Sequence, residues 1–303
     1  MACRPRRSVF ALVLTVAATA CSASAGSTPV PAVDGSGTPT TLAAVSSTSS
    51  MPIPTTTTVA PPSMSAADKE IDAEVVVPEG LGPFPAVVLV HGGGWVTGAP
   101  SIMRPLAEHL NANGYLTINT RYSLATPDRP GFPDAIEDVA CAVRFAASHP
   151  DSDGTVAVIG HSAGAHIGGL VALTGDQYGT RCPFSGSGLP DSFVGLAGPY
   201  DVSRLGPAVG AFFGDGPDQL PELWRAGNPQ LHTDANPDLA SLIMYGENDG
   251  LVAVSFAVEF HQALMESGSD ALLELVEGAR HGDMHDPDLV GDLIVTWLSR
   301  ARG

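Results

Sequence analysis

The sequence predicts one α/β domain with a mostly parallel β-sheet and helices on both faces. Short apolar runs typical of buried strands alternate with helical stretches from about residue 70 to the C-terminus. The segment from residue 67 to residue 303 has the length of one such domain. Polar and glycine-rich loops follow several of the runs. In a parallel sheet, loops at the carboxyl ends of the strands form the binding sites.

The first 20 residues are predicted to be an export signal. Three arginines precede an apolar stretch from Val9 to Ala20, which is too short to span a membrane comfortably. Cys21 follows small residues, as in a bacterial lipoprotein signal, so we expect Cys21 to be lipidated and to become the mature N-terminus. Ala18 stands where such signals usually have Leu, and plain secretion is the alternative. We therefore expect an exported protein of the cell envelope, which contacts the membrane only through this lipid.

Residues 21–66 are predicted to be a disordered tether. Ser, Thr, Ala and Pro dominate the segment, and Asp34 is its only charged residue. Without periodic apolar residues such a segment buries no core. We expect such a tether to hold the folded domain, residues 67–303, away from a membrane or to pass through a cell wall, and an unconstrained spacer is the alternative.

Seven strands and five helices are expected in the folded domain. The strand-like runs lie at 71–77, 86–90, 115–121, 155–160, 193–197, 240–245 and 271–276. The helical stretches lie at 101–113, 133–148, 163–173, 252–267 and 287–300.

A glycine run follows the strand at 86–90, where residues 91–95 read His-Gly-Gly-Gly-Trp. Backbone N–H groups without side chains in the way are suited to receive an oxyanion. Gly93 and Gly94 are therefore candidate oxyanion donors. A flexible loop without chemistry is the alternative.

Residues 160–164 read Gly-His-Ser-Ala-Gly and stand between a strand and a helix of small residues. A strand, a sharp turn that carries a serine, and a helix are what a nucleophile elbow requires. Ser162 is thus the candidate nucleophile, and the N–H of Ala163 joins Gly93 and Gly94 as a candidate oxyanion donor. Taken alone, the pentapeptide also fits an ordinary glycine-rich turn.

A serine nucleophile needs a histidine base and a carboxylate that orients the base. Asp249 follows the strand at 240–245, and His281 follows the strand at 271–276. Both come after the serine, in the order serine, acid, histidine. The alternatives are Glu247 and Asp283 for the acid and His285 for the base.

Three other histidines are assigned simpler roles. His91 and His161 are expected to orient backbone in their loops, and His166 to pack in its helix. A metal site is conceivable at His281, Asp283, His285 and Asp286. This spacing matches no common zinc or calcium pattern, so we expect no metal.

These motifs resemble the α/β-hydrolase superfamily, in the His-Gly-Gly-Gly esterase and lipase branch related to hormone-sensitive lipase and small bacterial carboxylesterases. The similarity extends over about residues 70–303 and depends on four ordered landmarks. They are His91–Trp95, Gly160–Gly164, Gly246–Asp249 and Arg280–Gly282. The resemblance implies a single α/β-hydrolase domain and a serine esterase that needs no cofactor and acts on a small-molecule ester.

The resemblance leaves the substrate open. Relatives often carry a helical N-terminal cap, and here the tether takes that place, which favours short-chain or soluble esters. The insertion at 199–238 contains Phe212, Phe213 and Trp224 and is expected to form a small lid, a wall of the acyl pocket, or simple packing. Alternatives are an arylformamidase or peptidase on the same triad, or a tethered binding protein without turnover.

Charge and cysteine content agree with an exported enzyme of small molecules. The formal net charge is −18, which argues against nucleic acid as a partner and against strongly anionic substrates. If Cys3 is removed with the signal and Cys21 is lipidated, Cys141 and Cys182 remain as one pair. In an oxidising compartment we expect a disulfide between them, with two buried thiols as the alternative.

Overall fold

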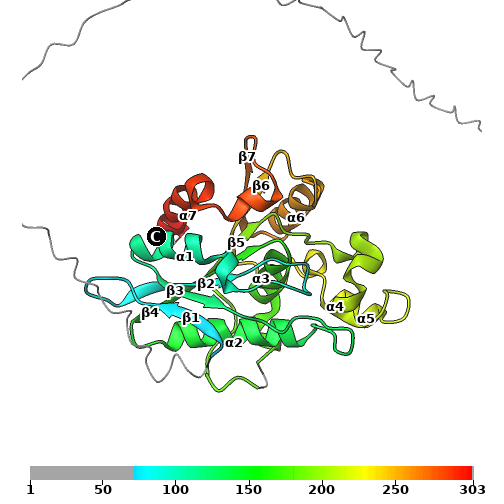
Figure 1. Ribbon diagram of the computed structural model, residues 1–303, viewed down its shortest axis with the longest axis horizontal. Helices are drawn as coiled ribbons and strands as arrows, with labels where there is room; N and C mark the ends of the chain where they lie inside the picture. Colours follow the sequence, from blue (N-terminus) through cyan, green and yellow to red (C-terminus); the bar gives the residue numbers. More distant parts are fainter. Residues whose placement is uncertain (1–70, 180, 302–303) are drawn as a thin grey trace, which may run out of the picture. The chain divides into compact units, whose positions relative to one another are not determined.

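The computed structural model describes residues 71–179 and 181–301, which contain a seven-stranded sheet (Figure 1). The strands are β1 (Ala73–Val76), β2 (Phe84–Val90), β3 (Leu116–Thr120), β4 (Ser152–His161), β5 (Ser192–Leu196), β6 (Ala240–Gly246) and β7 (Asp270–Val276). Their order across the sheet is β1-β3-β2-β4-β5-β6-β7. β1 pairs antiparallel with β3, and the other neighbours pair in parallel. The expected mostly parallel sheet is confirmed.

Helices cover both faces of the sheet. They are α1 (Arg104–Ala112), α2 (Asp134–Ser148), α3 (Ala163–Thr174), α4 (Gly210–Phe213), α5 (Pro221–Ala226), α6 (Ser255–Glu266) and α7 (Pro287–Ala301). α1 packs with α7 on one face, and α2 packs with α3 on the other (Figure 1). The burial pattern agrees with this arrangement, because strands covered on both faces have few exposed residues. β3 and β5 are buried at every position, and so are all residues of α3.

Several elements begin or end a few residues from their predicted boundaries, and two of these differences lie beside the candidate site. α6 begins at Ser255 and not at 252, because the preceding residues form a turn in which Asp249 accepts hydrogen bonds from the N–H groups of Leu251 and Val252. Within 199–238 lie α4, α5 and two 3₁₀ segments, Val202–Val209 and Pro229–Leu231. These pieces are too short to give a periodic signal in the sequence.

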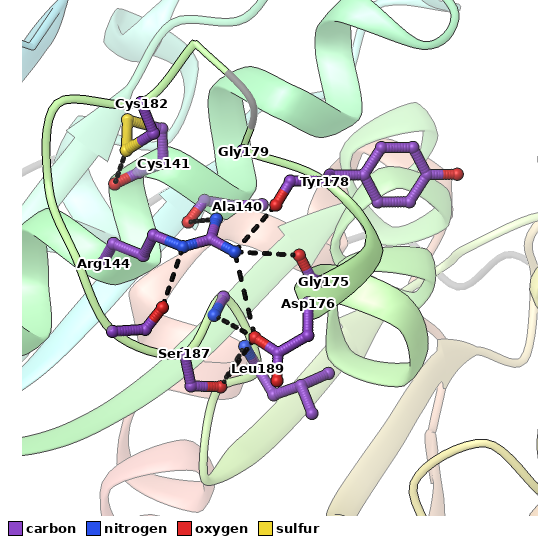
Figure 2. Close-up of polar contacts among 12 residues, drawn as sticks. Ala140, Cys141, Arg144, Gly175, Asp176, Tyr178, Gly179, Cys182, Ser187 and Leu189 are labelled. Carbon is purple, nitrogen blue, oxygen red and sulfur yellow. Dashed lines mark hydrogen bonds and ion pairs between the residues drawn. A yellow bond between two sulfur atoms is a disulfide. The ribbon is translucent and has the colours of Figure 1, made fainter.

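A buried arginine fastens the loop at 175–189 to α2 (Figure 2). The Arg144 guanidinium donates to the backbone carbonyls of Gly175, Tyr178 and Gly186, at 3.4, 2.7 and 3.1 Å. Asp176 lies 3.8 Å from the same group. Arg144 is 7% exposed, so these carbonyls replace the water that the charge loses on burial.

A disulfide joins the same two segments one helical turn away. Cys141 on α2 is bonded to Cys182, with their Cα atoms 5.4 Å apart (Figure 2). The loop at 175–189 is thus attached to α2 both covalently and through Arg144.

The predicted signal at 1–20, Cys21 and the tether at 21–66 lie outside the described residues. No helix among residues 71–179 and 181–301 is long and apolar enough to cross a membrane.

Replacement of Arg144 is expected to destabilise the protein more than replacement of an exposed arginine. Arg144→Met leaves three carbonyls without their donor and should lower the free energy of unfolding by about 3 kcal/mol. Arg181→Met is the matched control, because Arg181 is 58% exposed and pairs with Asp134 at the surface. That change should cost less than about 1 kcal/mol. Urea unfolding of the full chain measures both, and equal losses would contradict the role given to Arg144.

Candidate active site

Ser162 lies in a strained turn between β4 and α3. Its backbone has φ 54° and ψ −119°, a region that non-glycine residues rarely adopt. The Ser162 N–H donates to the carbonyl of Leu196 at the end of β5, at 2.8 Å. The turn is thereby fixed to the neighbouring strand, as expected of a nucleophile elbow.

The flanking glycines are required by the close approach of three backbones. A Cβ atom on Gly160 would overlap the carbonyl oxygen of Gly164. A Cβ atom on Gly164 would overlap the carbonyl oxygen of Val90, at the end of β2. Side chains at these positions would push α3 away from the strands and displace Ser162.

The structure brings Ser162, His281 and Asp249 together in one hydrogen-bonded chain. His281 Nε2 lies 2.9 Å from Ser162 Oγ, and His281 Nδ1 lies 2.8 Å from Asp249 Oδ2. The Asp249 side chain is fully buried, and its other oxygen accepts the N–H groups of Leu251 and Val252, both at 2.9 Å. Because a carboxylate only accepts, Nδ1 carries the proton and Nε2 is left to accept from the serine hydroxyl.

The alternative acids and base lie elsewhere. Asp283 accepts from the backbone N–H of Arg280 at 2.8 Å, which closes the turn at His281–His285. Glu247 is exposed at the end of β6. The His285 ring packs edge-on against His161, with ring centres 4.8 Å apart. Among the described residues no group of His, Cys, Asp or Glu side chains is placed to hold a metal ion.

The glycine loop after β2 lies against the elbow. Gly92 approaches so closely that a Cβ there would be 3.2 Å from Ser162 Cβ. Gly93 has φ 126°, and a Cβ on it would overlap the carbonyl oxygen of Thr97. Gly94 has φ 60° and faces open space. Ala163 is the first residue of α3, so its N–H has no carbonyl four residues earlier within the helix to bond.

His91 and His161 hold backbone, as expected. The His91 ring stacks on Tyr122, whose hydroxyl donates to the His91 carbonyl at 3.1 Å. His161 Nε2 donates to the carbonyl of His281 at 2.9 Å and so holds the loop of the candidate base. Burial lowers the pKa of His161 to about 4, so its ring is neutral at pH 7.

His166 does more than the helix packing expected of it. Its Nδ1 accepts from the indole N–H of Trp95 at 3.1 Å, and its Nε2 donates to the carbonyl of Gly227 at 2.8 Å. Burial lowers its pKa to about 4. No spacing in the sequence shows these bonds, because the partners are 71 and 61 residues away. The sequence did contain one signal: His166 is a polar residue in a mostly apolar helix. A buried polar ring needs hydrogen-bond partners, so this pattern indicates that His166 bonds other segments.

The aromatic residues of 199–238 pack in the interior. Phe212, Phe213 and Trp224 are each less than 5% exposed. Phe212 contacts Trp95 at 5.7 Å between ring centres, and Phe213 stacks on Trp224 at 4.5 Å. These three side chains are therefore part of the packed interior of the fold.

Two large cavities lie away from these residues. A cavity of about 570 Å³ is bounded by β1 and α1, and one of about 490 Å³ lies at the end of β3 beside His91. Neither is lined by Ser162, Asp249 or His281. We therefore locate the site by the hydrogen-bonded chain of side chains, whose chemistry is specific, and not by cavity size.

Comparison with known proteins agrees with this arrangement. A family model, BD-FAE, matches residues 75–264, which include both glycine motifs and Asp249. The chain belongs to the BD-FAE family. The matched range ends before His281, so the candidate base comes from the structure and from the motif at the end of β7.

The BD-FAE chain is similar to two curated proteins of Mycobacterium tuberculosis. It is 30% identical to Esterase LipC over 66% of this chain and 53% of the relative. It is also 30% identical to the probable carboxylic ester hydrolase LipM, over 61% of this chain and 46% of the relative. The chain therefore spans about half the length of these relatives.

A solved structure confirms the α/β-hydrolase fold. The acetyl ester-xyloside bifunctional hydrolase of Caldicellulosiruptor lactoaceticus superimposes with a TM-score of 0.65 over 75% of this BD-FAE chain and 87% of that one. The identity is 20%, so the likeness concerns the fold alone.

Acidification is expected to destabilise the fold through His161 and His166. Their folded pKa of about 4 lies below the unfolded value of 6.5, so the unfolded chain binds more protons between these values. Stability fully present above pH 6.5 is lost as the pH falls, by about 2 kcal/mol per histidine at pH 5. Urea unfolding at pH 7.5, 6.5 and 5 measures the loss. His166→Gln removes one group and should flatten the profile; an unchanged slope would refute this origin.

The two candidate donor glycines are expected to differ in their tolerance of alanine. Gly93→Ala should lower the free energy of unfolding by about 3 kcal/mol or more, since the new Cβ meets the Thr97 carbonyl at a φ that only glycine adopts freely. Gly94→Ala should cost about 1 kcal/mol, because its surroundings are open and its φ is left-handed. Paired urea titrations test the order, and a reversed order would contradict the loop geometry.

Proposed function

We propose that the protein is a serine esterase that hydrolyses carboxylic esters through an acyl-enzyme on Ser162. One observation carries the proposal, the hydrogen-bonded chain from Ser162 Oγ through His281 to the buried Asp249. The esterases among the relatives support the same reaction class. The His-Gly-Gly-Gly loop beside the elbow favours the branch of the superfamily related to hormone-sensitive lipase.

In acylation, His281 takes the proton of Ser162 as Oγ attacks the ester carbonyl. The imidazolium then gives this proton to the departing alcohol, and the acyl group remains on Oγ. In deacylation a water loses its proton to His281 and attacks the acyl carbon, and the proton returns to Oγ. Asp249 keeps the imidazole in the required tautomer and stabilises the imidazolium.

Each step passes through a tetrahedral intermediate with a negative oxygen. The N–H groups of Gly93, Gly94 and Ala163 are proposed to bind this oxygen. Loss of one such donor typically costs about 10²- to 10³-fold in rate. The open side of Gly94 and the helix N-terminus at Ala163 support this assignment.

The proposed substrates are small esters with short acyl chains. The aromatic side chains that could line a long acyl channel, Phe212, Phe213 and Trp224, are packed on one another and on Trp95. The net charge of −18 disfavours anionic esters.

A fluorophosphonate probe on the full chain tests the proposal, with the labelled peptide located by mass spectrometry. We expect labelling at Ser162 and turnover of p-nitrophenyl acetate and butyrate that exceeds turnover of the decanoate. Ser162→Ala and His281→Ala should abolish labelling. Asp249→Asn should lower kcat by about 10⁴-fold, since the wrong tautomer of the base is then held.

Glu247→Gln is the matched control for the acid, because Glu247 lies two residues from Asp249 and is exposed. It should keep wild-type turnover. A folded protein that is neither labelled nor active would refute the esterase and favour the binding protein. Cleavage of formanilides or peptides in preference to esters would favour the arylformamidase or peptidase.

A further inference from the structure

Trp95 connects the candidate oxyanion loop to the interior. It directly follows Gly94, has φ 64°, and is 6% exposed. Its carbonyl accepts the N–H of Ala125 at 2.8 Å, and its indole N–H donates to His166 Nδ1 at 3.1 Å. A bulky residue in left-handed conformation persists only where its surroundings hold it. These two bonds, together with the packing of Trp95 on Phe212, hold the end of the loop.

His166 presents a fixed acceptor to this indole. The Gly227 carbonyl can only accept, so His166 Nε2 carries the ring proton. The indole N–H can only donate, so Nδ1 must be the unprotonated nitrogen. The ring is fully buried and burial lowers its pKa to about 4, which keeps this single tautomer at neutral pH.

The resulting chain of bonds joins three separate segments of the protein. Trp95 belongs to the loop after β2, His166 lies one helical turn after Ser162 on α3, and Gly227 follows α5. The backbone N–H of His166 also bonds the Ser162 carbonyl at 3.1 Å. The same residue thus fixes both the elbow and the loop that faces it. Gly227 itself accepts no side chain, because a Cβ would overlap the Phe213 ring.

We propose that Trp95 and His166 are positioning residues of the oxyanion loop, and that their hydrogen bond sets the distance of the Gly93 and Gly94 N–H groups from the reacting carbonyl. This inference rests on the proposed esterase function and goes beyond it. Neither side chain touches the substrate, since both are buried and engaged with each other.

The expected effect is on kcat and not on KM. Oxyanion donors act at about 2.7–3.1 Å from the negative oxygen, so a small displacement of the loop weakens them in the transition state. The ground-state ester makes little use of these donors, and its binding should change little. Loss of the indole bond should therefore cost less than the loss of a donor, about 10-fold in kcat.

Trp95→Phe tests the bond directly, because it removes the N–H and keeps an aromatic ring in the packing. In the full chain with p-nitrophenyl acetate, we expect kcat to fall about 10-fold, with KM within 2-fold of wild type. His166→Leu should show a loss at least as large. In a protein that already carries His166→Leu, adding Trp95→Phe should lower kcat no further, because the bond is already lost. Such non-additivity is the coupling expected of two bonded residues.

Two further variants separate positioning from packing. Phe145→Leu removes volume at a buried phenylalanine on α2 that packs on His149 and Phe184, and it should lower the Tm while kcat stays within 2-fold. His166→Gln keeps a donor and an acceptor and should retain more of kcat than His166→Leu. If Trp95→Phe does not fold, the comparison of these two His166 variants tests the same bond.

The outcomes are distinct. Wild-type kcat in Trp95→Phe, or additive losses in the double variant, would overturn the positioning role while the esterase stands. A wild-type protein without labelling at Ser162 would instead overturn the esterase itself.

Discussion

The close approach of the β2, β4 and α3 backbones is the constraint on which the site depends. Gly160 and Gly164 have no room for a Cβ, because carbonyl oxygens occupy that space. Gly92 brings the loop after β2 against Ser162 in the same way. This contact brings the candidate nucleophile and three candidate N–H donors close together. It also forces Ser162 into a strained conformation, which the bond to Leu196 and the burial of α3 hold in place.

Histidines in different surroundings serve this site in different ways. His281 bonds a buried carboxylate on one side and a hydroxyl on the other, which is the environment of a proton carrier. His161 and His166 are buried without a carboxylate partner and are held neutral. A neutral imidazole offers one donor and one acceptor in fixed directions, so it can join backbone segments as a bridge. His161 joins the elbow to the loop of the candidate base through its Nε2 donor alone. His166 uses both ring nitrogens, and joins the elbow to the candidate oxyanion loop and to the segment after α5.

The buried aromatic residues of the 199–238 insertion pack through Phe132 against the loop that Arg144 binds. Phe132 contacts Phe212 and Phe213 on one side and Tyr178 on the other. The Tyr178 carbonyl is in turn bound by Arg144 on α2 (Figure 2). Protein interiors have little free volume, so a shift of one buried side chain strains the side chains packed against it. Arg144 and Trp95 are therefore joined through contacting residues, namely Tyr178, Phe132 and Phe212.

The sequence by itself determined the fold class, the strand order along the chain and the loops that carry chemistry. Apolar strand patterns and glycine motifs are local signals, and parallel strands bring their carboxyl ends to one edge whatever the intervening sequence. It also selected Asp249 and His281, while Glu247, Asp283 and His285 stayed as alternatives. Only the tertiary structure decided which carboxylate reaches His281, that Asp283 closes a turn, and that the 199–238 aromatics are interior. The sequence likewise did not predict the two hydrogen bonds of the His166 ring or the bonds of Arg144 to backbone carbonyls. Apart from the local turn of Arg280 and Asp283, these features depend on contacts between residues far apart in the chain, for which spacing and periodicity carry no signal.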